Sequence, residues 1–494
     1  MVALLHQGPV TRWLFLAVLL VVASCSSATD ENDSERNSNA SGIASNDVTT
    51  DDTINNEPVD PGDSQADSVP AEGTDETGGG TGPSATGDSQ ILFDQDALHT
   101  FELTLSEEAL AEIDADPTAE QHVEGALHFQ GETIEPVGIR YKGSIGAFVG
   151  CVSSPDLFNP TGEKTCTKLS MKIKINWDDP DQEFYGQRKL QFHAMNLDPT
   201  QLHERLGYSL FREMGVAAPR ATHARLVING EYSGVYALVE QIDSRFTRQN
   251  FPDGTGNLYK EAWPFTSNGD VQSDATFIDS LRTNEDDAPT STLTRTFAEQ
   301  LANTNNTTRV LDEWMDLEAI VTHLVVDRAI RHDDGPLHWY CFGDECEPHN
   351  FYWYEDPSGP KLHLIPWDLD NAFENLVSAS NPVTPIADKF GEITNDCEPF
   401  ASGGFGLTQL SAACDPLFAA IAAETDLWQE IEDDLWNGPL AKETVEAQLD
   451  TWVDQISNAT AEANSVHNDA ASIEQWLQRV ETFKESLDYV RTRR

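Results

Sequence analysis

The chain has little positive charge. Its 494 residues include 30 lysines and arginines against 84 aspartates and glutamates, which gives a formal net charge of −54 at pH 7. A surface so acidic argues against nucleic acid and anionic membrane surfaces as partners, because both carry negative charge themselves. The composition fits both an adaptation to high salt and a surface that meets basic substrates, and it does not choose between them.

Sequence signatures of several protein classes are missing. The chain contains no Gly-x-Ser-x-Gly run and no His-Glu-x-x-His run, so the sequence supports neither a serine hydrolase with a nucleophile elbow nor a zinc protease. It has no Cys-x-x-Cys pair to support a zinc site. It also shows no internal repeat. The apolar run near the N-terminus, Trp13 to Val22, is too short to span a bilayer.

That apolar run is typical of an export signal. Arg12 precedes it, and Val22-Ala23-Ser24-Cys25 follows in the manner of a lipobox, where cleavage ahead of Cys25 lets its thiol take a diacylglyceryl group. We predict a lipoprotein signal peptide at 1–24 and an exported, extracytoplasmic protein anchored to the membrane of the bacterial cell envelope by the lipid at Cys25. An ordinary secretory signal ending in A-x-A is the alternative.

Residues 25–90 have almost no large apolar side chains. From Ser26 to about Gln90 the chain is rich in Ser, Asp, Asn, Thr, Gly and Pro, and it has fifteen acidic residues against one arginine. Such a segment cannot bury enough surface to offset the entropy that ordering would cost. We expect a disordered acidic tether at 25–90. It carries about −14 of the net charge of −54, which leaves about −40 on the rest.

Six cysteines remain when Cys25 is set aside. An even number in an exported chain favours disulfides. Six cysteines allow fifteen pairings, but these lie in three local couples and short loops close most easily. The predicted pairs are Cys151–Cys166, Cys341–Cys346 and Cys397–Cys414.

Residues 91–494 are enough for one large domain or for two packed lobes. Alternating apolar residues predict strands, apolar residues at helical spacing predict helices, and Asn229-Gly230 predicts a hairpin turn. The predicted strands cover 100–105, 123–129, 134–141, 169–175, 224–228, 234–240, 351–354 and 361–365, and the predicted helices begin at 106, cover 202–211 and 311–330, and fill the chain beyond about 417. This order predicts an α+β fold with a mostly antiparallel N-terminal sheet and a helical C-terminal part.

One group of candidate residues lies in a predicted turn. Phosphoryl transfer needs a loop that covers the phosphates and a lysine that a helix carboxylate holds in place. The segment 140–146 offers Arg140, Lys142 and two glycines, which could approach a phosphate. A plain hairpin explains the same residues equally well.

A second group is basic and lies on the predicted strand at 169–175. Lys168, Lys172 and Lys174 share one face of it, while apolar residues share the other. Lys172 or Lys168 could reach a nucleotide, and Glu204, at the start of the next predicted helix, could pair with that lysine. A solvated lysine face and a surface glutamate are the alternatives.

A third group is acidic. Asp333 and Asp334 follow the predicted helix at 311–330, Asn350 precedes a strand, and Asp368 and Asp370 follow another. Carboxylate and amide oxygens suit Mg²⁺ or Mn²⁺. Charges placed where an apolar strand leaves the core are costly without a partner. Together these residues predict a metal site.

Four runs in this order resemble the spore coat protein H (CotH) kinase family. They are Asn229-Gly230-Glu231-Tyr232-Ser233-Gly234-Val235-Tyr236 with Glu240, His332-Asp333-Asp334-Gly335, Asn350-Phe351-Tyr352-Trp353-Tyr354, and Ile365-Pro366-Trp367-Asp368-Leu369-Asp370. The resemblance extends from about Phe101 to Ala420. It implies a two-lobed, atypical protein-kinase-like fold that uses ATP and Mg²⁺ or Mn²⁺ to phosphorylate Ser or Thr of a protein substrate, with the N-lobe at about 91–245 and the C-lobe at about 246–494.

The resemblance also implies roles for single residues. Asp334 resembles the catalytic aspartate, with Asp333 as the alternative. The implied metal ligands are Asn350, Asp370 and Asp368, and the implied nucleotide-binding residues are Lys172 or Lys168, Glu204, Arg140, Lys142 and Glu240. Asp334 and Asn350 are separated by sixteen positions, which departs from a compact kinase catalytic loop. Cys341 and Cys346 lie between them and predict an excursion pinned by a disulfide.

The expected function is an extracytoplasmic, metal-dependent protein kinase acting on Ser or Thr of surface or secreted proteins. ATP is scarce outside the cytoplasm, so another nucleotide could be the donor, or the substrate could be met before secretion is complete. The alternative is a catalytically inactive surface lipoprotein for assembly, or for binding carbohydrate or calcium, with Trp339, Trp353 and Trp367 as sugar-stacking candidates.

Overall fold

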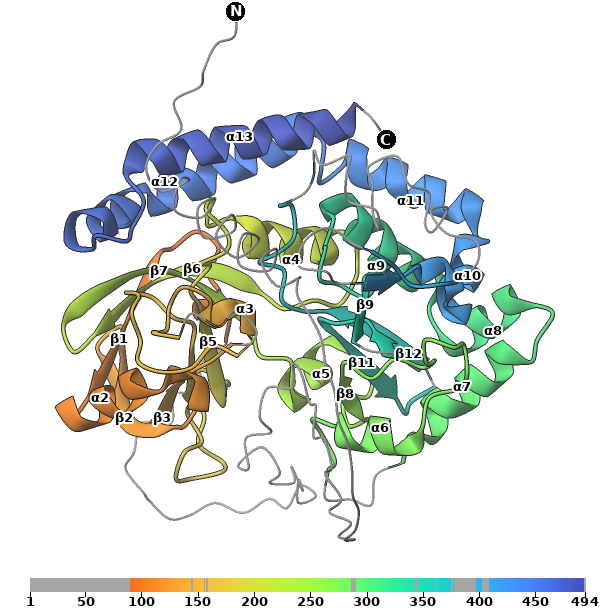
Figure 1. The fold of residues 1–494 in the computed structure, drawn as a ribbon, viewed down its shortest axis with the longest axis horizontal. Helices are drawn as coiled ribbons and strands as arrows, with labels where there is room; N and C mark the ends of the chain where they lie inside the picture. The colour runs from red at the N-terminus through yellow and green to blue at the C-terminus, as the bar shows by residue number, and fades with distance from the viewer. Residues whose placement is uncertain are drawn as a thin grey trace, which may run out of the picture. The chain divides into compact units, whose positions relative to one another are not determined.

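The computed structural model describes residues 89–492, except 144, 155, 157–158, 286–289, 343–344, 360, 375, 377–396 and 402–407. The predicted signal peptide, Cys25 and all of the predicted tether before Ser89 lie outside the described residues, so these stay predictions. Within the described residues the fold is mixed, with strands concentrated in the first part and helices in the last (Figure 1). No helix in this part of the chain is long and apolar enough to cross a membrane.

The N-terminal part is a closed barrel in the order β1-β2-β3-β4-β5-β7-β6. Every neighbouring pair is antiparallel except β1 with β6, which is parallel. The strands are β1 (His99–Leu105), β2 (Val123–Phe129), β3 (Glu132–Tyr141), β4 (Met171–Lys174), β5 (Lys189–His193), β6 (Ala221–Ile228) and β7 (Glu231–Val239). The helices in this part are α2 (Glu107–Ala115), α3 (Ile145–Phe148) and α4 (His203–Glu213), with short 3-10 turns at Ser89–Ile91 and Pro117–Ala119.

Local sequence signals explain several of these boundaries. The side chain of Ser106 accepts a hydrogen bond from the backbone of Ala109 and so caps α2. Asn229 and Gly230 join β6 to β7 with φ values of 51° and 80°. Asparagine and glycine tolerate this left-handed conformation, which a two-residue hairpin turn requires. The predicted hairpin is therefore confirmed.

Both faces of β4 are buried. Met171 and Ile173 belong to the apolar cluster inside the barrel. On the other face Lys172 and Lys174 are only 4% and 6% exposed. The alternative of a solvated lysine face is therefore wrong for these two residues.

The C-terminal part contains two small sheets surrounded by helices (Figure 1). One sheet has the order β12-β11-β8 and the other has the order β10-β9-β14-β13. The strands are β8 (Leu258–Lys260), β9 (Trp339–Phe342), β10 (Glu345–Glu347), β11 (Phe351–Asp356), β12 (Lys361–Pro366), β13 (Phe400–Ala401) and β14 (Thr408–Leu410). The helices are α5 (Ser244–Asn250), α6 (Asp274–Asp279), α7 (Thr292–Ala302), α8 (Thr307–Trp314), α9 (Leu317–Ile330), α10 (Pro416–Ala422), α11 (Thr425–Asn437), α12 (Lys442–Val466) and α13 (Ile473–Arg491), with a 3-10 turn at Ala412–Cys414.

The single helix predicted at 311–330 is wrong. The chain leaves helical conformation at Met315, and Asp316 begins a new helix by accepting a hydrogen bond from the backbone of Ala319. An aspartate that caps a helix competes with continuation of the helix before it, which the apolar pattern alone does not register.

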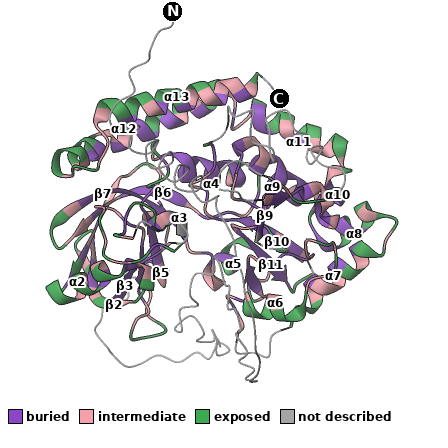
Figure 2. Ribbon diagram, in the orientation of Figure 1, coloured by how far each residue is buried: buried purple, intermediate pink, exposed green. Residues whose placement is uncertain are grey.

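The last two helices pack along β6, β7 and α4 (Figure 1). The hydroxyl of Tyr232 on β7 donates to the carbonyl of Ala459 on α12 at 3.0 Å, and the indole of Trp476 on α13 donates to the carbonyl of Thr200 at 2.8 Å. Figure 2 shows the buried residues on the inner sides of these helices and the exposed ones outside. On helices α11 to α13, Leu435, Trp452 and Trp476 are buried and Trp428 is partly buried.

The structure contains the three predicted disulfides, Cys151–Cys166, Cys341–Cys346 and Cys397–Cys414. The pair Cys341–Cys346 joins β9 to β10, whose antiparallel register places the two cysteines opposite each other.

Candidate functional site

The acidic residues after α9 lie next to the start of β11. Helix α9 ends at Arg331, which has a left-handed backbone with φ of 48°. The Oδ2 atom of Asp334 then accepts a hydrogen bond of 2.8 Å from Nδ2 of Asn350. The excursion between these two residues is the β9–β10 hairpin, and the structure returns Asn350 to the side of Asp334 despite its length. The predicted catalytic residue and the first predicted metal ligand are therefore in contact.

The end of β12 brings the next two acidic residues to the same place. Strands β11 and β12 pair so that the backbone N–H of Trp367 donates to the carbonyl of Asn350 at 3.2 Å. Asp368 and Asp370 follow directly. Asn350 and Asp368 have φ values of 57° and 51°. Asparagine and aspartate tolerate this left-handed region better than other residues with a Cβ, so the two positions suit the residues that occupy them.

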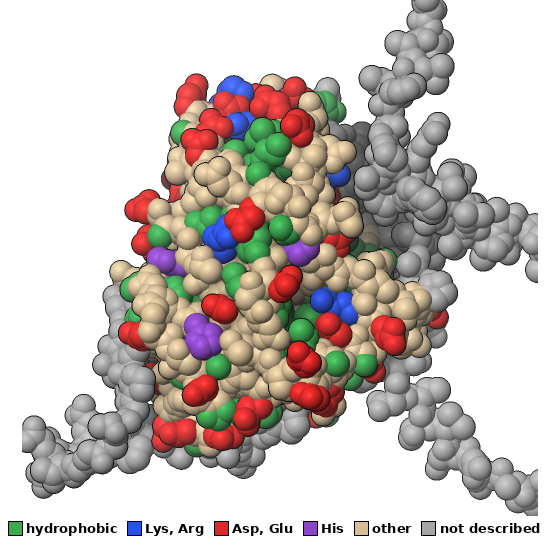
Figure 3. Space-filling view, turned by 90° about the vertical axis from the view of Figure 1, so that its left-hand side faces the viewer, with side chains coloured by type: hydrophobic (Ala, Val, Ile, Leu, Met, Phe, Trp, Pro, Cys, Tyr) green, Lys and Arg blue, Asp and Glu red, His purple; other side chains and the backbone are tan. Residues whose placement is uncertain are grey.

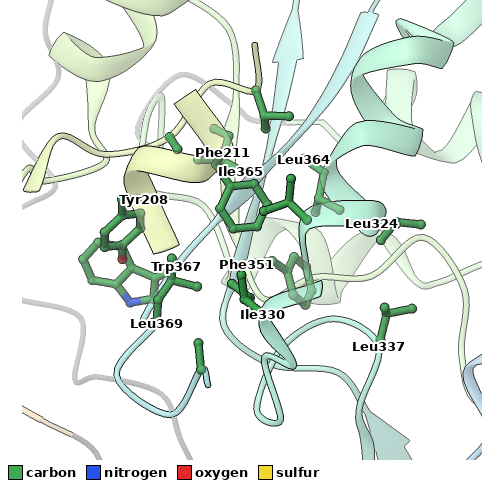
Figure 4. Close-up of a cluster of buried hydrophobic side chains, with 14 of the residues drawn as sticks. Tyr208, Phe211, Leu324, Ile330, Leu337, Phe351, Leu364, Ile365, Trp367 and Leu369 are labelled. Atoms are coloured by element: carbon green, nitrogen blue, oxygen red, sulfur yellow. The ribbon is translucent and has the colours of Figure 1, made fainter. Parts of the chain in front are cut away.

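Buried neighbours hold the backbone of Asp368. Its N–H donates to the hydroxyl of Tyr208 on α4 at 3.0 Å, and its carbonyl accepts from Nε2 of His332 at 3.0 Å. The other ring nitrogen of His332 lies 3.2 Å from Oδ2 of Asp327 on α9. Burial alone would lower the pKa of His332, but the hydrogen bond and the charge of Asp327 raise it above its usual value. Figure 4 shows Tyr208 and Trp367 among the apolar side chains beneath this loop.

The carboxylates of this region repel one another. Burial raises the pKa values of Glu204, Asp334 and Asp370, and the charge of Asp368 raises all three further. Oε2 of Glu204 is buried and has no hydrogen-bond partner among the described residues. Oxygen donors that repel one another and keep free acceptor capacity fit a hard divalent cation such as Mg²⁺ or Mn²⁺. The chemistry of these donors is that of a site for such a cation at the acidic loop.

A second set of donors shares Asp368. One ligand atom each from His193, Glu204 and Asp368 lie within 4.8 Å of one another. His193 ends β5, and its Nδ1 lies 2.7 Å from Oε1 of Glu204, while its Nε2 lies 2.9 Å from Nζ of Lys142. Both ring nitrogens are thus engaged, so the oxygens of Glu204 and Asp368 are better placed than the histidine to serve a cation.

The predicted basic residues separate into distinct environments. Nη1 of Arg140 forms a buried ion pair of 2.7 Å with Oε2 of Glu120. Lys142 is 4% exposed, and its ammonium lies over the ring of Trp367, 5.2 Å from the centroid. Lys172 is opposite Arg140 in the sheet and is also buried. The contact of Lys142 with Trp367 places its ammonium next to the acidic loop.

Lys168 and Glu240 make their described contacts elsewhere. Nζ of Lys168 donates to the carbonyl of Val235 at 2.6 Å, and burial lowers the pKa of this lysine to about 8. Glu240 forms an ion pair with Arg220. Asp333, the alternative catalytic residue, lies with Oδ1 3.7 Å from Nε2 of His338 and not in the hydrogen bond to Asn350. The structure thus brings Lys142, Glu204, Asp334, Asn350, Asp368 and Asp370 together.

Sequence reasoning missed several residues of the site. His193, Glu120 and Tyr208 carry no local motif, because each acts through a partner far away in the chain. His332 lies inside the His332-Asp333-Asp334-Gly335 run, so the sequence could indicate that it lies near the site. Its hydrogen bonds to Asp327 and Asp368 could not be predicted from the run.

Curated proteins with related sequences carry CotH or spore coat names. The chain is 25% identical over 207 residues to the protein named Invasin CotH7 of Rhizopus delemar, which covers 40% of this chain and 33% of that protein. It is 36% identical over 63 residues to the inner spore coat protein H-like protein of Bacillus subtilis and 31% identical over 72 residues to the inner spore coat protein H of the same organism. These two matches cover 13% and 14% of this chain and 20% of each relative. The chain therefore spans a third or less of the length of these relatives.

Among solved structures, the complex of HipA and HipB from Shewanella oneidensis MR-1 with operator DNA is similar over 79% of this chain and 79% of that chain. The identity is 13% and the TM-score is 0.28, a similarity too weak to establish fold or function.

The family comparison covers much more of the chain. The family described as CotH kinase protein matches residues 139–494, a range that includes every predicted catalytic, nucleotide-binding and metal-binding residue. It also includes all four sequence runs that suggested the resemblance. The chain belongs to the CotH kinase protein family.

Proposed function

We propose that this protein is an atypical protein kinase that transfers the γ-phosphate of ATP to Ser or Thr of a protein, with Mg²⁺ or Mn²⁺. One observation carries the proposal. The hydrogen bond between Asp334 and Asn350 lies beside the acidic loop that follows β12, and Lys142 of the barrel reaches the same loop. An acid for the acceptor hydroxyl, metal ligands and a phosphate cation are the parts that phosphoryl transfer needs.

In this proposal the barrel and the C-terminal part are the two lobes of a kinase-like fold. The carboxylate of Asp334 accepts the proton of the acceptor hydroxyl, and its bond to Asn350 fixes its orientation. Asn350, Asp368 and Asp370 hold the divalent cation, which when bound neutralises charge on the phosphates. Tyr208, His332 and Asp327 act indirectly, because they hold the backbone on which Asp368 stands.

The proposed substrates are surface or secreted proteins, and the proposed location is the outer side of the membrane, with the lipid at Cys25 as anchor. The acidic surface of this protein supports substrates whose phosphate-accepting segments are basic. Figure 3 shows many acidic side chains and few lysines and arginines on one face of the described residues. Opposite charge on the substrate would raise the rate of encounter at low salt.

The second candidate is a catalytically inactive surface module that binds calcium. The cluster of carboxylates favours it, because calcium also takes oxygen ligands. Its carbohydrate-binding form has lost support. Trp339, Trp353 and Trp367 are between 0% and 2% exposed, so none of them offers a face for a sugar to stack on.

Isothermal titration calorimetry distinguishes the two candidates. The kinase is expected to bind ATP in the presence of Mg²⁺ or Mn²⁺ and to bind it much more weakly in a chelator. The matched variant Asp370→Asn should lose the metal dependence. Calcium binding with no binding of any nucleotide would contradict the kinase and support the surface module.

A further inference from the structure

A histidine stands between a lysine and a glutamate at the edge of the barrel. Lys142 follows β3, His193 ends β5, and Glu204 is in the first turn of α4. Nζ of Lys142 lies 2.9 Å from Nε2 of His193, and Nδ1 of His193 lies 2.7 Å from Oε1 of Glu204. All three side chains are between 1% and 4% exposed.

The protons of this chain of bonds fit a single arrangement. A lysine ammonium can only donate, and a carboxylate can only accept. Lys142 therefore donates to the lone pair on Nε2, and the N–H at Nδ1 of a neutral His193 donates to Glu204. The ammonium of Lys142 is charged, and hydrogen bonds to charged groups are the stronger ones.

The same contacts aim Lys142 at the acidic loop. Its ammonium lies over the ring of Trp367, and the ring of His193 meets that indole edge-on with centroids 5.8 Å apart. Trp367 directly precedes Asp368, whose carboxylate lies within 4.8 Å of the ligand atoms of His193 and Glu204. A phosphate that bridges a metal on this loop would therefore meet the ammonium of Lys142.

A separate ion pair fixes the backbone beside Lys142. Glu120 accepts a hydrogen bond of 2.8 Å from the N–H of Gly143 and pairs with Arg140 at 2.7 Å. The residues on both sides of Lys142 are thus held by one buried carboxylate. The lysine is presented by a fixed backbone and not by a free loop.

We propose that Lys142 is the lysine that contacts the nucleotide phosphates and that His193 positions it by linking it to Glu204. Protein kinases join a lysine on a strand directly to a glutamate on a helix. In this protein the strand before the helix supplies a histidine instead, and the lysine follows the end of a different strand, β3. The inference rests on the proposed function, and it selects Lys142 over Lys172 and Lys168.

Binding of Mg·ATP to the full chain, measured by calorimetry, tests this assignment. The variants K142M and H193L should each weaken binding by about 10- to 100-fold, the range for losing a hydrogen bond to a charged group. H193Q should keep most of the affinity, because an amide has one acceptor and two donors. The double variant H193L/K142M should bind no more weakly than K142M, since both changes break one chain of bonds.

K172M tests the rival assignment. It removes a buried lysine from the neighbouring strand and should weaken binding much less than K142M. Thermal melting of each variant without ligand identifies any that do not fold. Should H193L not fold, H193N replaces it; its shorter amide can still reach Glu204 but not Lys142, so it should bind as K142M does.

Three outcomes overturn the assignment. One is tight binding by K142M together with loss of binding in K172M or K168M. Another is a double variant whose loss is the product of the two single losses, because His193 would then act independently of Lys142. If instead the unchanged protein binds no nucleotide with either metal, the proposed function itself fails and the assignment fails with it.

Discussion

Replacing Asp368 with asparagine should stabilise the metal-free protein. Ligand atoms of Asp368 and Glu204 lie within 4.8 Å, and two unit charges at that distance repel by about 3 kcal/mol at an effective dielectric constant of 20. Asp368 is partly exposed and Lys142 offsets some of the charge, so we expect a gain of on the order of 1–2 kcal/mol. Asparagine has nearly the same shape and tolerates the left-handed backbone of this position.

The substitution removes no hydrogen bond that would offset this gain in stability. No described residue donates a hydrogen bond to the carboxylate of Asp368, and the bonds to Tyr208 and His332 involve its backbone. Urea unfolding without metal should therefore give D368N the larger free energy of unfolding. With Mn²⁺ at about 100 times its dissociation constant, the unchanged protein should gain about 2.7 kcal/mol and D368N much less. The order of stability should thus reverse when metal is added.

The control for D368N is D454N, which removes one negative charge from an exposed position on α12. It should change stability little and leave the response to Mn²⁺ intact. A metal-free D368N that is less stable than the unchanged protein would refute the argument from charge repulsion. An equal gain from Mn²⁺ in both proteins would refute Asp368 as a metal ligand.

Three further predictions follow from particular contacts. In G207A the new Cβ would lie 2.8 Å from Cδ1 of Leu369, so we expect the free energy of unfolding in urea to fall by about 1–2 kcal/mol and Mn²⁺ binding to weaken. A rise of about 1 kcal/mol, which is the usual effect of replacing glycine by alanine at an exposed helix position, would contradict this. Replacing both cysteines of Cys341–Cys346 by serine should lower the free energy of unfolding by about 2 kcal/mol and slow phosphate transfer. If neither the free energy of unfolding nor the rate of transfer changed, a structural role for this disulfide would be contradicted. Burial and the charge of Arg205 lower the pKa of His223 to about 3, so as the pH falls the unfolded chain binds a proton before the folded one does. The free energy of unfolding should therefore fall by about 1.4 kcal/mol per pH unit below pH 6.5. H223Q should flatten this dependence of stability on pH, and an unchanged dependence would contradict the assignment to His223.

Local patterns predicted much of the fold. The strand at 123–129 could be read from apolar alternation, because a strand with one face on a core repeats every second residue. The strand at 351–354 is a continuous aromatic run, as expected for a strand that is buried on both faces. The hairpin at Asn229-Gly230 follows from the backbone freedom of those two residues. The disulfides followed from short separations between cysteines.

Contacts between distant segments were not predictable in the same way. The burial of Lys172 depends on what covers the outside of the barrel, and a single strand cannot reveal that. The division of the helix predicted at 311–330 depends on one capping side chain, Asp316.

For the site, the acidic half could be predicted because Asp334, Asn350 and Asp368 stand in recognisable runs near strand and helix ends. The basic half could not be predicted, because Lys142, His193 and Glu204 come from three separate elements. No spacing in the sequence indicates that these three residues lie in contact.

Phosphate transfer tests the central claim most directly. The full chain is incubated with ATP labelled at the γ-phosphate, Mn²⁺ and a generic acceptor such as casein or a basic protein, and phosphoserine and phosphothreonine are identified by mass spectrometry. We expect label on serine or threonine of the acceptor or of the chain itself, and loss of most of it in D334N, with D454N as active as the unchanged protein. Absence of transfer with either Mg²⁺ or Mn²⁺, or equal transfer by D334N, would contradict the assignment of this site as a protein kinase centre.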